Sequence, residues 1–84
     1  MDIFICEDNF LLALDLEAQV EDAGHRSLGI ASRSQECLDR IGADRPDVVI
    51  LDLNLADGRT GPDLLLKLNH AGIPSIVVSG EATF

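Results

Sequence analysis

The sequence predicts an α/β domain with a parallel β-sheet, and two observations support that prediction. Apolar runs too short for helices alternate along the chain with longer segments of helical periodicity. Strands that alternate with helices of about ten to fifteen residues pack as a parallel sheet with right-handed crossovers. The chain has 84 residues, 46% of them hydrophobic, and no internal linker, so we expect one domain over residues 1–84.

The first half of the chain supplies two strands and a helix. The apolar run 3–6 predicts a strand, and residues 10–23 show helical periodicity. Asn9 suits the N-cap of that helix, and Gly24 stands where a C-terminal cap is expected. Residues 27–31 alternate apolar and small residues, which indicates a half-exposed edge strand.

A second helix and a buried strand follow. Ser34 can cap a helix that ends near Gly42. One face of this helix carries Cys37, Leu38 and Ile41. Pro46 and Asp47 then break the chain before the β-branched run 48–51, which is typical of a strand covered on both faces.

The last predicted elements are a third helix and a fourth strand. Thr60 and Asp63 have the spacing of a capping box, and Pro62 lies where a first helical turn tolerates proline. The helix presents one apolar face, formed by Leu64, Leu65, Leu68 and Ala71. Gly72 ends the helix, and residues 75–79 form another strand of the buried type.

Composition excludes several classes of protein. The formal charge is −9 and the six basic residues are scattered singly, which disfavours direct nucleic-acid binding. No apolar run approaches the length of a membrane span, and the start of the chain lacks the basic region of a secretory signal. We therefore expect a cytoplasmic protein, in which Cys6 and Cys37 are reduced core residues.

The acidic residues of greatest interest stand immediately after predicted strands. Glu7 and Asp8 follow the first strand, Asp52 and Asn54 belong to the end of the third, and Ser79 ends the fourth. Parallel strands end on one edge of the sheet, so three carboxylates meet there if the first and third strands are neighbours. Such a group needs either a raised pKa or a cation, and a few hard oxygen ligands suit Mg²⁺.

Each of these residues also has a purely structural explanation. Asp8 or Asn9 can simply cap the first helix, and Ser79 can be a hydroxyl that closes a turn. His25 and His70 stand at helix ends, where surface roles are common. Because neither histidine nor cysteine belongs to the acidic group, zinc is disfavoured.

Three stretches together resemble a known family. They are the acidic pair in ICEDN, the aspartate in VVILDLNL and the hydroxyl in IVVSG. In this order, over essentially all 84 residues, they resemble the receiver domain of response regulators in two-component signalling. The resemblance implies a flavodoxin-like parallel sheet with strand order 2-1-3-4.

The resemblance also implies roles for individual residues. Asp52 would accept a phosphoryl group from a histidine kinase or a phosphotransfer protein. Glu7, Asp8 and Asp52 would hold Mg²⁺ together with the backbone carbonyl of Asn54, and Ser79 would contact the phosphoryl oxygens. Such a domain is not an enzyme, apart from promoting its own phosphorylation and dephosphorylation.

The sequence departs from the family pattern in three ways. Ala56 stands where the family usually has proline, and the loop to Gly61 is slightly longer than the common form. The chain stops at Phe84, whereas the family continues through a fourth helix, a fifth strand that ends in lysine, and a fifth helix. The one lysine, Lys67, lies in the third predicted helix. We therefore expect a truncated receiver in which phosphorylation of Asp52 is impaired.

Two surfaces are expected to bind partners. Without a fifth strand, the apolar strand 75–79 becomes an exposed edge, which favours pairing with another chain. The first helix has one apolar face toward the sheet, formed by Leu12, Leu16, Val20 and Ala23. It has a second apolar face, formed by Phe10, Leu11, Leu14 and Ala18. This face either packs against an element that truncation has removed or is a docking surface for a kinase. We expect a homodimer through the fourth strand and first helix.

Two other functions compete with the phospho-acceptor hypothesis. One is a non-phosphorylatable interaction module that binds through the same strand edge and helix. The other is a nucleotide-binding α/β enzyme, which is disfavoured because CEDNF, after the first strand, places negative charge where a glycine-rich phosphate loop would stand.

Overall fold

The structure is a computed structural model that describes residues 1–53, 55 and 60–78. The seven elements alternate strictly between strand and helix. They are β1 (Asp2–Cys6), α1 (Phe10–Asp22), β2 (Arg26–Ala31), α2 (Ser34–Ala43), β3 (Val48–Asp52), α3 (Gly61–His70) and β4 (Ser75–Val78).

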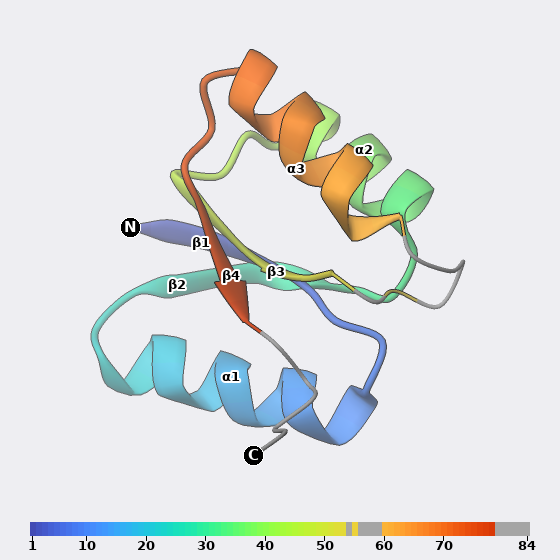
Figure 1. The fold of residues 1–84 in the computed structure, drawn as a ribbon. Coiled ribbons are helices and arrows are strands. Elements are labelled where there is room, and N and C mark those ends of the chain that lie inside the picture. The colour runs from blue at the N-terminus through green and yellow to red at the C-terminus, as the bar shows by residue number, and fades with distance from the viewer. Residues whose placement is uncertain (54, 56–59, 79–84) are drawn as a thin grey trace.

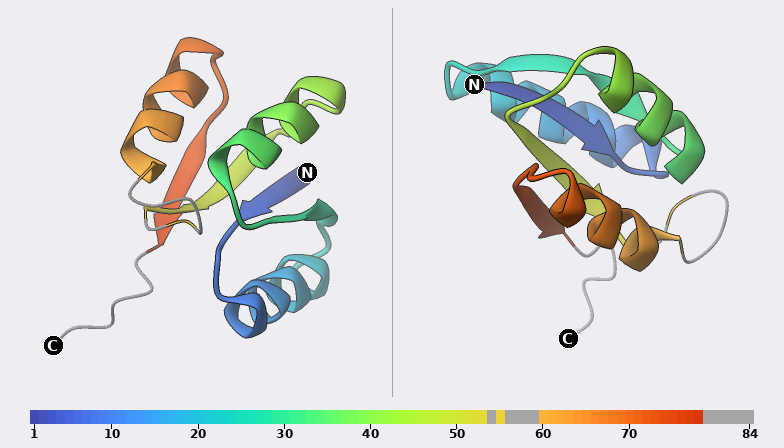
Figure 2. Two further views of the ribbon diagram at one scale, coloured as in Figure 1. Left: turned by 90° about the vertical axis from the view of Figure 1, so that its right-hand side faces the viewer. Right: turned by 90° about the horizontal axis from the view of Figure 1, so that it is seen from above.

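The four strands form one parallel sheet in the order β2-β1-β3-β4. Helix α1 covers one face of the sheet, whereas α2 and α3 lie side by side on the other face (Figures 1 and 2). The predicted fold class and strand order are confirmed. Because β1 and β3 are adjacent, the ends of the two central strands lie next to each other.

Two apolar clusters, one on each face, hold the helices to the sheet. Successive strand residues point to opposite faces, so β1 contributes Phe4 and Cys6 to one cluster and Ile3 and Ile5 to the other. The cluster beneath α2 and α3 also contains Cys37, Ile41, Val49, Leu51, Leu64 and Leu68, among others. The cluster beneath α1 contains Ala13, Val20 and Ile50. The prediction that the third strand is buried on both faces is confirmed.

The local signals at the ends of α1 are confirmed. The side-chain oxygen of Asn9 accepts a hydrogen bond of 3.1 Å from the amide of Leu12, as an N-cap residue does. Gly24 has φ +86°, the left-handed conformation that closes many helices. The cap role therefore belongs to Asn9, and the Asp8 side chain takes no part in it.

Three expectations about helix ends and faces are wrong. Ser34 is the first residue of α2 rather than its cap, and Arg33 occupies the cap position. Thr60 does occupy the cap position of α3, but its side chain makes no capping hydrogen bond and its backbone is already helical. In α1 the buried inner face includes Ala13 and Val20, whereas Ala23 lies beyond the helix and is exposed.

The apolar run of β4 by itself is typical of a buried strand, but the expectation that this strand forms an exposed apolar edge is confirmed. Ile76 is 55% and Val77 44% exposed. The reason is that β4 pairs only with β3, so in the described part of the chain nothing covers its other side. Ala71 is exposed because α3 ends before it, whereas Leu64 and Leu68 are buried as expected.

Among the residues that the structure describes, no helix is both long and apolar enough to cross a membrane.

Candidate functional site

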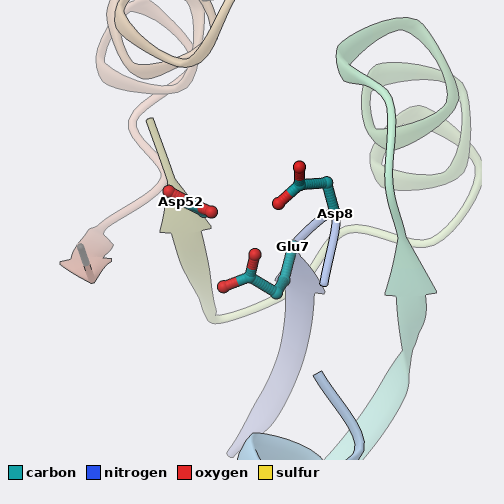
Figure 3. A group of neighbouring side chains, drawn as sticks. All are labelled: Glu7, Asp8 and Asp52. Atoms are coloured by element: carbon teal, nitrogen blue, oxygen red, sulfur yellow. The ribbon is translucent and has the colours of Figure 1, made fainter. Parts of the chain in front are cut away.

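The strand order brings the acidic residues of β1 and β3 together. Cys6 pairs with Leu51 in the parallel register, so Glu7 and Asp52 are the next residues along two neighbouring strands. Glu7 follows β1 directly, and Asp52 is the last residue of β3. Figure 3 shows the carboxylates of Glu7, Asp8 and Asp52 facing a common space at this edge of the sheet.

The three side chains form a compact acidic cluster. One carboxylate oxygen from each of Glu7, Asp8 and Asp52 lies within 4.8 Å of the others. Glu7 is 1% exposed and Asp52 is 3% exposed, whereas Asp8 is open to solvent. Two of the three carboxyl groups are therefore placed where water cannot stabilise a negative charge.

Glu7 is the least satisfied member of this cluster. Its amide donates a 3.0 Å hydrogen bond to the carbonyl of Ala31, and its Oε2 accepts one of 3.2 Å from the amide of Asn9. Its Oε1 is buried and has no hydrogen-bond partner. Burial, together with the neighbouring carboxylate of Asp52, raises the pKa of Glu7 to about 8. The cluster thus keeps a proton that an exposed glutamate would lose.

The donor set fits a hard divalent cation. All three groups are carboxylates, which suit Mg²⁺, and the unpartnered Glu7 Oε1 leaves an acceptor that a cation would satisfy. The open side at Asp8 leaves room for water or phosphoryl oxygens. The sequence prediction that these three carboxylates converge is confirmed.

The histidines and cysteines lie outside the acidic cluster. His25 Nδ1 contacts the N-terminal amine at 3.0 Å, and His70 is the exposed last residue of α3. Cys6 and Cys37 are free, fully buried thiols, as expected. The hydrogen bond between these two thiols and their burial raise the pKa of Cys6 far above its usual value.

Two predicted site residues lie outside the described residues. They are Asn54, whose backbone carbonyl was expected to bind the metal, and Ser79, the expected phosphoryl contact. Ala56 also lies outside the described residues. Their roles remain predictions.

Sequence reasoning overlooked a hollow beside the acidic cluster. This hollow has a volume of about 250 Å³ and is lined chiefly by Glu7, Asp8, Phe10, Ser32 and Glu36. Ser32 follows the second strand directly, just as Glu7 follows the first. A search for polar residues after every strand would therefore have found this region.

Comparison with known proteins gives a consistent answer. The family model described as the response regulator receiver domain matches residues 3–83. The phyllosphere-induced regulator PhyR of Methylorubrum extorquens is 42% identical over 69 residues, which are 80% of this chain and 26% of that protein. The transcriptional regulatory protein PhoP of Escherichia coli O157:H7 is 30% identical over 86 aligned positions, covering 100% of this chain and 38% of that protein.

Solved structures show the same likeness. The solution structure of the PhyR receiver domain from Erythrobacter litoralis has a TM-score of 0.87 at 27% identity, covering 95% of this chain and 63% of that one. The crystal structure of the anti-anti-sigma factor PhyR from Bartonella quintana has a TM-score of 0.86 at 32% identity, covering 95% of this chain and 33% of that one. The chain thus spans 26% and 38% of the length of the two curated relatives. Its fold, its acidic cluster and the family match over residues 3–83 agree, and the chain belongs to the response regulator receiver domain family.

Proposed function

We propose that this domain is a phospho-acceptor module of two-component signalling, in which Asp52 accepts a phosphoryl group from a histidine kinase or a phosphotransfer protein. The observation that carries the proposal is the acidic cluster. The carboxylate of Asp52 stands at the end of a central strand, with those of Glu7 and Asp8 within 4.8 Å. Family membership supports this assignment, because receiver domains take part in two-component signalling.

In this proposal Glu7, Asp8 and Asp52 hold Mg²⁺ at the edge of the sheet. Bound Mg²⁺ supplies positive charge that offsets the carboxylates and the incoming phosphoryl oxygens. A carboxylate oxygen of Asp52 forms a bond to phosphorus as the bond between phosphorus and the donor's imidazole nitrogen breaks. Because Asp52 is the last residue of β3, the strand positions its attacking oxygen.

Two further roles belong to the proposal through the family resemblance. The backbone carbonyl of Asn54 adds a ligand to the metal, and the hydroxyl of Ser79 contacts a phosphoryl oxygen. Substitution of Ser79 by alanine tests the second role. It should leave phosphorylation of Asp52 possible while weakening any response that depends on it.

Residues 1–84 do not include the lysine that ends the family's fifth strand, and this bears on the rate at which Asp52 is phosphorylated. The sole lysine, Lys67, is an exposed residue of α3 and therefore does not occupy the family's lysine position at the end of a strand. We propose that residues 1–84 alone are phosphorylated more slowly than the same residues followed by a complete fifth strand with its lysine. A comparison of the two phosphorylation rates tests this point.

Partners other than the phosphodonor are proposed by analogy. One solved structure contains the anti-anti-sigma factor PhyR of Bartonella quintana in complex with the anti-sigma factor NepR, and 90% of this chain aligns with 32% of that one. We propose that this receiver likewise controls a regulatory protein contact inside the cytoplasm. Direct binding to nucleic acid or to membranes is not part of the proposal, given the formal charge of −9.

A second candidate function is an interaction module that needs no phosphorylation. It is favoured by the exposed apolar residues of α1 (Phe10 66%, Leu11 78%, Leu14 41%) and of β4 (Ile76 55%, Val77 44%). In this case the chain forms a homodimer through the β4 edge and α1. Light scattering should then give a dimer mass that Ile76→Lys reduces, whereas Leu66→Lys, at an equally exposed leucine of α3, leaves it unchanged.

Phosphorylation is tested directly by intact-mass measurement. The chain is incubated with Mg²⁺ and acetyl phosphate, and we expect an increase of one phosphoryl group. Asp52→Asn should abolish the adduct, whereas Asp22→Asn, at an exposed aspartate that ends α1, should not. If neither the 84 residues nor a longer form acquires the adduct, the phospho-acceptor function is wrong and the interaction module remains.

A further inference from the structure

The turn between β1 and α1 carries two of the three carboxylates of the candidate metal site. Glu7 follows β1, Asp8 comes next, and Asn9 is the N-cap of α1. Figure 3 shows the carboxylates of Glu7 and Asp8 at the end of β1. Asp8 is exposed, so its side chain must give up conformational freedom to hold a cation. How well both carboxylates are placed therefore depends on what holds this short turn.

Asn9 ties the turn to the first turn of α1. Its side-chain oxygen accepts a 3.1 Å hydrogen bond from the amide of Leu12, and its carbonyl accepts one of 2.9 Å from the amide of Ala13. The backbone of Asn9 is extended, with φ −82° and ψ 107°, as expected for an N-cap residue. The start of α1 thus fixes the direction of the Asn9 backbone amide.

That amide is bonded to a carboxylate of the candidate metal site. It donates a 3.2 Å hydrogen bond to Oε2 of Glu7. The amide of Glu7 in turn donates at 3.0 Å to the carbonyl of Ala31, the last residue of β2. Glu7 is therefore held to the sheet by its backbone and to the cap of α1 by one side-chain oxygen.

This anchoring restricts the oxygen of Glu7 that remains for a cation. A carboxylate is planar, so fixing Oε2 limits the directions in which Oε1 can point. Oε1 is buried and has no hydrogen-bond partner among the described residues. A ligand that is oriented before the metal arrives needs less ordering when the metal binds, which favours affinity. If Asn9 were a helix cap alone, its contacts would end at α1, but the bond to Glu7 extends them to the site.

We propose that Asn9 is a positioning residue for the candidate metal site. By capping α1, its side chain holds its own amide against Glu7 Oε2, and this keeps the carboxylates of Glu7 and Asp8 in the arrangement that binds Mg²⁺. The inference rests on the metal site of the proposed function, but it does not require phosphorylation of Asp52. Loss of the cap is expected to weaken metal binding as well as the helix.

The test is the affinity of the ¹⁵N-labelled chain for Mg²⁺, measured without a phosphodonor. Mg²⁺ is titrated, and the backbone amide shift of Asp8 gives the dissociation constant. Asn9→Ala removes the capping oxygen and should weaken Mg²⁺ binding about tenfold, as loss of a group that orients a metal ligand does. Asn9→Ser supplies another capping oxygen and should restore an affinity close to that of the original chain.

Gly24→Ala provides the matched control at the other end of α1. Gly24 has φ +86°, and nothing lies within 4 Å of a Cβ built there, so alanine adds backbone strain and no clash. This variant should lower the thermal midpoint about as much as Asn9→Ala, because each weakens one end of the same helix. It should nevertheless leave the Mg²⁺ dissociation constant unchanged.

A second readout needs no metal. In EDTA, the amide of residue 9 should exchange with water faster in Asn9→Ala than in the original chain, after correction for the intrinsic rate, because it is no longer held against Glu7. Asn9→Ser should restore slow exchange, and Gly24→Ala should not alter it. Protection of the Leu51 amide, in β3, verifies that each variant is folded.

Several outcomes overturn the proposal. An unchanged Mg²⁺ dissociation constant in Asn9→Ala, or an equal loss of affinity in Gly24→Ala, would make Asn9 a helix cap and nothing more. A loss that Asn9→Ser does not restore would show that capping is not what positions Glu7. Absence of Mg²⁺ binding by the original chain would remove the metal site itself. If the chain binds Mg²⁺ but acetyl phosphate does not modify Asp52, the phospho-acceptor function fails and the role of Asn9 is still decided by the Mg²⁺ affinities.

Discussion

At the free edge of β2 two backbone carbonyls are bonded by a side chain of the same chain. The guanidinium of Arg40, reaching from α2, donates hydrogen bonds to the carbonyls of Ile30 (3.0 Å) and Leu28 (3.3 Å). The amide of Gly29 donates to the hydroxyl of Ser27 at 3.2 Å. These two carbonyls are therefore less available to the amides of another strand.

At the carboxyl ends of β1 and β3 the polar atoms are of one kind only. Glu7, Asp8 and Asp52 bring three acceptors together, and Glu7 Oε1 has no donor although it is buried. The difference between the two regions is instructive. The two β2 carbonyls find a donor within the chain, whereas Glu7 Oε1 is a buried acceptor that a ligand from outside could satisfy. Loss of the contacts at the β2 edge should destabilise the protein, whereas neutralising a carboxylate of the acidic cluster should not.

The largest expected effect concerns pH at the acidic cluster. The pKa of Glu7 is about 8 in the folded chain, against 4.5 for the ordinary side chain. Between these values the folded state keeps a proton that the unfolded state has lost. The associated stability is therefore fully present below about pH 4.5 and is lost as pH rises through about 8.

Urea unfolding in EDTA should thus show the free energy of unfolding falling between pH 5 and pH 9, by an amount on the order of a few kcal/mol. Saturating Mg²⁺ should remove the fall, because it stabilises the ionised carboxylates. Glu7→Gln should flatten the profile in EDTA. A wild-type profile that is already flat in EDTA would show that Glu7 is satisfied, and the contrast between the two regions would disappear.

The second prediction breaks the β2 edge at its glycine. Gly29 has φ +134°, and a Cβ there would meet the guanidinium of Arg40. Gly29→Val should lower the free energy of unfolding by about 2–3 kcal/mol, from backbone strain and the displaced arginine hydrogen bonds. Urea denaturation measures the loss.

Gly42 of α2 provides the matched control for this variant. Nothing lies within 4 Å of a Cβ built there, and the position is helical. Gly42→Ala should stabilise the chain by about 0.5–1 kcal/mol, as replacement of glycine in a helix usually does. We expect the two substitutions to change stability in opposite directions. Equal destabilisation by both would count against a stabilising role of the Arg40 hydrogen bonds to β2.

The smallest expected effect comes from removing the arginine itself. Arg40→Gln deletes the donors to Leu28 and Ile30 and the stacking of the guanidinium 5.1 Å above the ring of Phe4. Because these carbonyls remain partly accessible to water, the cost should be about 1–2 kcal/mol in urea unfolding. Arg33→Gln, at the exposed cap position of α2, should change stability by less than about 0.5 kcal/mol. A similar cost for both arginines would mean that the Arg40 contacts contribute nothing specific.

Much of the fold could be predicted because its signals are local. Asn9 and Gly24 mark the ends of α1, and the β-branched run of β3 marks a strand covered on both faces. The failures arise where packing overrides local pattern. Ala23 has the right spacing for the inner face of α1, but the helix ends before it and its side chain is exposed. In β4 the apolar run alone indicates a buried strand, and the exposure of Ile76 and Val77 agrees instead with the expected position of this strand at the sheet edge.

The candidate site was predictable in part for the same reason. That Glu7, Asp8 and Asp52 follow strands is visible in the chain, and their convergence needed only the assumption that the two strands are neighbours. The hollow at Ser32 and Glu36 was missed because it joins three elements that periodicity treats separately. The Arg40 contacts were missed because they depend on how α2 lies over β2.

The sequence by itself determined the alternation of strands and helices and the placement of carboxylates after the first and third strands. Hydrophobic periodicity and helix capping depend on residues only a few positions apart, so they can be recognised in the sequence. Only the tertiary structure decided which oxygen of Glu7 lacks a donor, which sheet edge its own side chains satisfy, and where the acidic hollow opens. These properties arise from contacts between residues far apart in sequence, and packing alone brings those residues together.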